Sequence, residues 1–124
     1  MLIGSYRDEG KAELCREKGC FYYHAIRENG DPVNIEARHL HAEFFVPYVG
    51  SHGLGWYAPV SGVKLVSREK LAATLGVDAA TFFGSQCPYY FMLSFSNPVD
   101  GLPPTTASPV RGRPRTLAWA ELWK

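Results

Sequence analysis

Cysteine, net charge and long apolar runs are all scarce in this chain. Its 124 residues include three cysteines, and none of them has the Cys-x-x-Cys spacing of a redox pair or a zinc ribbon. This usage fits a reducing compartment, so we expect a cytoplasmic protein. No apolar run approaches the length of a membrane span, and residues 1–5 are too short for the apolar region of a signal peptide. We therefore expect no membrane partner.

The charges almost cancel. Lys and Arg number 13 and Asp and Glu number 12, which gives a formal net charge of +1. Non-specific affinity for nucleic acid depends on how many phosphates Lys and Arg neutralise. The chain is therefore not a general binder of polyanions, and any such binding must be local.

Familiar catalytic patterns are also missing. The sequence has no paired-carboxylate signature, no phosphate-cradling glycine loop followed by Lys, and no nucleophile-elbow pattern. Cys87 could direct a thiol toward a histidine such as His52, as in acyl transfer. A cysteine that precedes a proline at the start of a strand is more typical of a small buried residue. We therefore do not predict an enzyme, and we expect no cofactor.

Histidine and cysteine offer a rival chemistry. His39 and His41, two residues apart on an extended segment, would share a face, and with Cys20 and His24 they could supply nitrogen and sulfur ligands for Zn²⁺. No carboxylate stands in the sequence where it would evidently accept a hydrogen bond from a zinc-bound histidine. Half-exposed strand histidines explain the same pattern, so we assign no metal site and keep a small metal-dependent enzyme as an alternative.

Two helices are predicted from their ends. Asp8 can cap a helix that runs to about Lys18 and stops at Gly19, and Ser67 can cap a second one that runs to Leu75 and stops at Gly76. A final helical turn is expected from Thr116 to Trp123. The strands are predicted at residues 1–5, 21–26, 33–37, 43–49, 56–66 and 89–95.

Local signals refine these strands. Asn29-Gly30 predicts a hairpin between 21–26 and 33–37, and Pro47 predicts an edge or a bulge. Neither face of 89–95 is very polar, which indicates a central strand, and the four prolines within 97–109 indicate a long connection. We predict an α+β fold in a single small domain (1–124), with a twisted, mostly antiparallel sheet or pseudo-barrel and two or three short helices.

The segment 110–115 is the most distinctive in the chain. Arg111, Arg113 and Arg115 are separated by Gly112 and Pro114, which do not allow a helix, and each guanidinium can contact phosphates. The run Arg-Gly-Arg-Pro at 111–114 resembles the core of an AT-hook, a DNA minor-groove motif. A hairpin or strand edge with solvated arginines is the alternative.

Aromatic residues flank a glycine-rich loop at 50–55. Flat rings beside such a loop can stack bases, each worth about 1–3 kcal/mol, although core packing also explains rings of this kind. We expect the loop to gate the pocket, with Trp56 as one wall and Tyr57 on the opposite face. The predicted ligand-binding residues are Trp56, Tyr57, His52, Phe45, Tyr48, Arg111, Arg113 and Arg115.

The order of elements resembles a known group of domains. The residues that carry the likeness are the first strand and helix, Phe44-Phe45, Trp56-Tyr57, the segments 60–71 and 89–93, and the closing 115–122. Together they resemble the PUA-like group, especially its EVE and ASCH-type members. The resemblance implies a cleft in a pseudo-barrel that binds RNA or modified DNA bases.

These observations lead to one expected function and two alternatives. We expect a module that binds nucleic acid or a nucleotide fragment through an aromatic pocket and the arginine-rich segment. A homodimer formed through edge strands and exposed aromatics such as Trp123 is the first alternative. The metal-dependent enzyme is the second.

Overall fold

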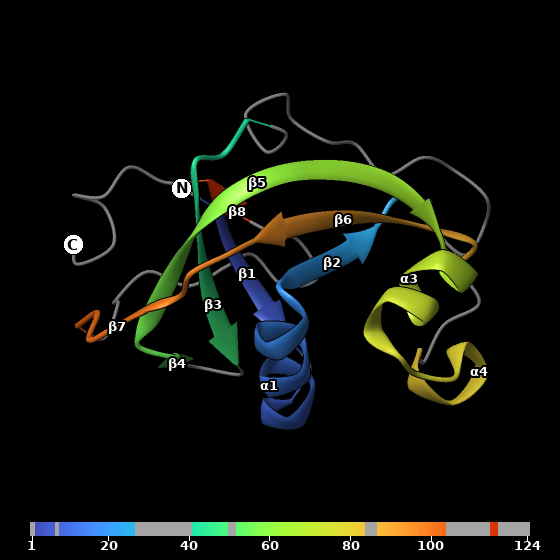
Figure 1. The fold of residues 1–124 in the computed structure, drawn as a ribbon, viewed down its shortest axis with the longest axis horizontal. Helices are drawn as coiled ribbons and strands as arrows, with labels where there is room; N and C mark the ends of the chain where they lie inside the picture. The colour runs from blue at the N-terminus through green and yellow to red at the C-terminus, as the bar shows by residue number, and fades with distance from the viewer. Residues whose placement is uncertain are drawn as a thin grey trace.

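The computed structural model describes residues 2–6, 8–26, 41–49, 52–83, 87–103 and 115–116 of the chain. They form an α+β domain around one mostly antiparallel sheet that does not close into a barrel, which confirms the predicted fold class without its pseudo-barrel form. In chain order the elements are β1 (Leu2–Tyr6), α1 (Glu9–Lys18), β2 (Cys20–His24), β3 (Phe44–Val49), β4 (His52–Gly53), β5 (Trp56–Ser67), α3 (Arg68–Leu75), α4 (Ala79–Phe82), β6 (Tyr89–Phe95), β7 (Val99–Asp100) and β8 (Arg115–Thr116) (Figure 1).

One long strand organises the sheet. The strand order is β2-β6-β5-β3-β1-β8, with β4 paired to β3 and β7 paired to β5. All the pairs between described strands are antiparallel except β1 with β3. The first part of β5 pairs with β3 and its second part pairs with β6, with a register shift between Val60 and Gly62. Because a bulge bends its strand, β5 arches between two halves of the sheet (Figure 1).

The predicted start and end of both α1 and α3 are confirmed. The Asp8 carboxylate accepts the Lys11 N–H at 2.8 Å at the start of α1, and the Ser67 hydroxyl accepts the Lys70 N–H at 3.1 Å at the start of α3. Each helix ends at a glycine in the left-handed region, Gly19 and Gly76, both with a φ of 71°. Strand β6 lies between β2 and β5, so its predicted central position is also confirmed.

Other predictions need correction or fall outside the described residues. Strand β3 is an inner strand, so the predicted edge position for Pro47 is wrong. On one side of β3, Phe44 and Phe45 pair with β5 and Tyr48 and Val49 pair with β4, and Pro47 lies between these two paired stretches. A missing N–H is tolerated in such a gap. Thr116 belongs to β8, and the rest of the helical turn predicted at 116–123 lies outside the described residues. The predicted hairpin at 28–31 and its second strand lie outside the described residues, whereas β4, β7 and α4 were not predicted.

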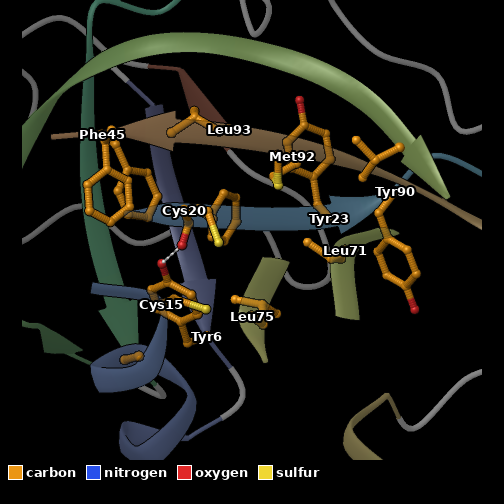
Figure 2. Packing of buried hydrophobic residues seen from close by; sticks show 14 of the residues in the cluster. Tyr6, Cys15, Cys20, Tyr23, Phe45, Leu71, Leu75, Tyr90, Met92 and Leu93 are labelled. Atoms are coloured by element: carbon orange, nitrogen blue, oxygen red, sulfur yellow. Dashed lines mark hydrogen bonds between the residues drawn. The ribbon is translucent and has the colours of Figure 1, made fainter. Parts of the chain in front are cut away.

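The core has two sides. On one side, Phe21 of β2 stacks on Phe45 of β3 with ring centroids 4.8 Å apart, which joins the two halves of the sheet. On the other side, α3 contributes Leu71 and Leu75, beneath β6, which carries Tyr90 and Met92 (Figure 2). This packing fixes the position of Phe45, one of the predicted ligand-binding residues.

Gly4 of β1 leaves room for the Phe21 ring of β2. A Cβ added at Gly4 would lie 2.7 Å from both Cε atoms of the Phe21 ring, which is itself buried. We expect Gly4→Ala to lower the free energy of unfolding by about 1–3 kcal/mol, because the ring must leave its position in a packed core. Urea denaturation measures this change.

Gly62 provides the matched control for this substitution. A Cβ there would meet nothing within 4 Å, so we expect Gly62→Ala to change the free energy of unfolding by less than about 1 kcal/mol. Equal effects of the two substitutions would show that the Phe21 ring does not restrict Gly4.

Candidate functional site

Strand alternation separates the predicted aromatic residues onto two faces of the sheet. Phe45 and Trp56 point to the inner face, where their ring centroids are 6.1 Å apart and both side chains are buried. Tyr57 is half-buried on the opposite face, as predicted, and its ring lies 5.9 Å from that of Phe44. Tyr48, three residues after Phe45, shares the face of Tyr57 and is buried. The structure therefore brings together Phe45 and Trp56 but not all four rings.

The Trp56 ring is covered by an arginine from α1. The Arg16 guanidinium lies 4.9 Å from the centroid of the Trp56 ring, and Phe95 packs against the same indole at 5.4 Å. Stacking of a base on the side of Trp56 that Arg16 covers would require Arg16 to move away.

A carboxylate holds this arginine in place. The two terminal nitrogens of Arg16 donate to the two carboxylate oxygens of Asp100 at 2.9 and 3.0 Å. This hydrogen bonding raises the pKa of Arg16 and lowers the pKa of Asp100. Because β7 pairs Asp100 with Trp56 in the sheet, the carboxylate is delivered to the arginine by backbone pairing. Arg16 and Asp100 were not among the predicted site residues, and they are far apart in the sequence.

The glycine-rich loop is anchored where the structure describes it. His52 and Gly53 form β4, which pairs with Val49 and Tyr48 of β3. Further on, the Gly55 carbonyl accepts the N–H groups of Gly101 and Leu102 at 3.1 and 3.0 Å. Gating by this loop remains a prediction, and any such motion must break these contacts.

The arginine-rich segment reaches the sheet through its last member. Arg115 lies in β8 opposite Ile3 of β1, whereas Arg111 and Arg113 are outside the described residues. Three strand spacings separate β8 from β5, about 14 Å at the usual spacing. The predicted arginine and aromatic components are thus on different strands of one sheet.

The histidines and the cysteine weighed as zinc ligands are not brought together in the part of the chain that the structure describes. Cys20 is buried at the start of β2, and His24 is exposed at its end, about 13 Å away at the rise of an extended strand. His41 is exposed, and His39 lies outside the described residues. Among the described residues, no group of three or more His, Cys, Asp or Glu could hold a metal ion.

A buried cluster of polar groups lies where α1 meets β2, and it was not among the predicted sites. The Tyr6 hydroxyl donates to the Cys20 carbonyl oxygen at 3.0 Å, and the buried side chains of Cys15 and Cys20 lie beside it (Figure 2). Burial, helped by the neighbouring thiols, raises the pKa of Tyr6 well above its usual value. The predicted helix ending at Gly19 was the signal for this contact, because such endings bring together the residues on either side of the turn.

No protein-family model, curated protein or solved structure matches this chain. The PUA-like resemblance is therefore still a prediction from the sequence. None of the helices in the described ranges has the length and hydropathy needed to cross a bilayer.

Proposed function

We propose that this chain is a binding module for nucleic acid or a nucleotide fragment, and that residues 111–115 contact the phosphate backbone. The observation that carries the proposal is the pairing of β8 with β1, by which an arginine-rich segment is attached to a folded sheet. A basic segment fixed at one end loses less conformational entropy on binding than a free tail does.

The charge pattern supports a local anion-binding surface. Between Asp100 and Glu121 the sequence contains Arg111, Arg113 and Arg115 but no acidic residue. Elsewhere basic and acidic residues are interspersed, and a cation such as Arg16 is already paired with a carboxylate. The positive charge of 111–115 therefore has no acidic neighbour in sequence.

The aromatic part of the proposal rests on Tyr57. Its ring is half-buried, whereas those of Phe45, Tyr48 and Trp56 are buried, and Arg16 covers the Trp56 ring. A ligand that reaches both β8 and Tyr57 on β5 must cross about 14 Å, or about four nucleotides at 3.4 Å each. An oligonucleotide fits this span better than a single nucleotide does.

Titration of labelled oligonucleotides at several salt concentrations tests the proposal. We expect binding tighter than about 100 μM at low salt, and an affinity that increases with length up to at least about four nucleotides. Replacing Arg111, Arg113 and Arg115 with Ala should weaken binding and reduce the salt slope for single strands by about two, because each phosphate contact contributes about 0.7.

A second triple variant removes the same charge from elsewhere. Lys18, Lys64 and Lys70 are exposed on α1, β5 and α3, and their replacement with Ala should leave the salt slope nearly unchanged. The proposal fails if the protein binds no oligonucleotide even at low salt, or if the two triple variants lose affinity equally.

Self-association is the second candidate, and it rests on a different surface. Leu65 and Tyr89 are 61% and 44% exposed, and they lie as diagonal neighbours on the paired strands β5 and β6. Apolar side chains exposed together are typical of interaction surfaces. Light scattering on the same samples distinguishes the two candidates, since a module that acts by self-association gives a dimer and no oligonucleotide binding.

A further inference from the structure

Two buried cysteines meet where α1 ends and β2 begins. Cys15 lies in the last turn of α1 and Cys20 is the first residue of β2. Between them Gly19 has a φ of 71°, and its N–H points to the carbonyl oxygens of Arg16 and Cys15. In helix endings of this kind, the side chains on either side of the turn pack together. Here both of these side chains are thiols, with exposed fractions of 0% and 2%.

The two thiols are chemically unequal. The hydrogen bond from the Cys15 thiol lowers the pKa of Cys20, although burial opposes this effect. The same hydrogen bond, together with burial, raises the pKa of Cys15. Cys20 is therefore the thiol of the pair that loses its proton more readily. A thiolate beside a protonated thiol is the arrangement from which a disulfide forms in two steps.

The remaining cysteine has different surroundings. The Cys87 thiol donates to the carbonyl oxygen of Ile26 at 2.7 Å and to that of Tyr89 at 3.0 Å. Its hydrogen bonds go to backbone oxygens, which cannot take part in disulfide formation. Cys87 therefore serves as an internal control for the reactivity of the pair.

We propose that Cys15 and Cys20 are a peroxide-sensitive dithiol, which hydrogen peroxide converts into an intramolecular disulfide. The Cys20 thiolate attacks one peroxide oxygen, so that an S–O bond forms, the O–O bond breaks and hydroxide leaves, taking up a proton to become water. The Cys15 sulfur then attacks the Cys20 sulfur, so that the S–S bond forms and the sulfenic oxygen leaves as a second water. Two thiols lose two electrons in total, and one peroxide molecule is reduced to two water molecules.

Burial selects the oxidant. Hydrogen peroxide is close to water in size, whereas a peptide disulfide must place its sulfur in line with a thiolate that is almost fully enclosed. The Tyr6 hydroxyl, at the end of β1, donates to the Cys20 carbonyl oxygen and also holds the start of β2 in place. The folded protein should therefore react with peroxide faster than with oxidised glutathione.

Peptide mapping of the full chain tests the proposal. The folded protein is treated with a small excess of peroxide, its free thiols are alkylated in denaturant, and the protein is digested with trypsin. We expect a cross-linked pair of peptides, 12–16 with 19–27, that lacks two hydrogen atoms and separates when a thiol reductant is added. Cys87 should stay reduced and be recovered alkylated.

Two variants decide the order of the steps. Cys87→Ser should give the same yield of the cross-link, whereas Cys15→Ser should leave a sulfenic acid on Cys20 that a 1,3-dicarbonyl probe traps. If Cys15→Ser does not fold, the peptide map of the wild-type protein alone tests whether the disulfide forms. The proposal is overturned if peroxide consumes Cys20 without forming the cross-link, if Cys87 is oxidised as fast as Cys20, or if the cross-link appears only in urea.

Discussion

Replacing Phe45 with alanine should lower the free energy of unfolding by about 3–5 kcal/mol, a large share of the stability of an ordinary domain. The Phe45 side chain is 0% exposed and stacks on Phe21 and Phe95 with centroid distances of 4.8 and 5.4 Å. Tyr6 and Trp56 approach it edge-on at 6.2 and 6.1 Å. Its loss opens a cavity between the two halves of the sheet, which cannot close because both are fixed by backbone pairing.

The preceding residue provides the control for this substitution. Phe44 is half-buried on the other face of β3, and we expect Phe44→Ala to cost clearly less than Phe45→Ala in urea denaturation. Phe45→Leu, which keeps most of the volume, should cost about 1 kcal/mol. Equal losses for Phe44→Ala and Phe45→Ala would contradict the core position of Phe45, whereas lost oligonucleotide binding at unchanged stability would place Phe45 in the proposed ligand site.

Gly19→Ala should destabilise the protein by more than the same substitution at Gly76. Both glycines end helices with a φ of 71°, so each substitution carries the cost of a left-handed alanine, about 1–2 kcal/mol. A Cβ at Gly19 would in addition lie 2.7 Å from the Phe95 carbonyl oxygen, whereas one at Gly76 would meet nothing within 4 Å. The Gly19 carbonyl also accepts the Phe95 N–H at 2.8 Å, which prevents the turn from moving away.

The difference between the two variants isolates this contact. We expect Gly19→Ala to cost about 1–3 kcal/mol more than Gly76→Ala in the free energy of unfolding, measured by urea denaturation. A difference near zero would mean that the turn at Gly19 relaxes without affecting β6.

The sequence was informative where a structure is decided by neighbouring residues. Asp8 and Ser67 predicted the start of α1 and α3, and Gly19 and Gly76 predicted their ends, because each cap hydrogen-bonds backbone groups a few residues away. The alternation of Trp56 and Tyr57 also followed from the strand itself. By contrast, α4 has only four residues and β4 and β7 have two each, too few for a periodic pattern.

The candidate site could be predicted only in part, because the surroundings of a side chain depend on distant segments. The aromatic segments at 44–48 and 56–57 were identified, but the sequence could not show that Arg16 from α1 and Asp100 from β7 cover Trp56. The arginine-rich segment was also identified, and its attachment to the sheet required the pairing of β8 with β1.

By itself the sequence determined the helix ends, the strand character of the main segments and the uncompensated charge of 111–115, because these depend on residues close together in the chain. Tertiary structure decided that β3 is an inner strand, parallel to β1, and that Gly4 admits the Phe21 ring. It also decided that the turn at Gly19 buries a thiol on each of its sides within the core. Such contacts depend on how the whole sheet bends and on which surfaces it buries. The bending and the burial follow from the total free energy of packing, which no local sequence signal contains.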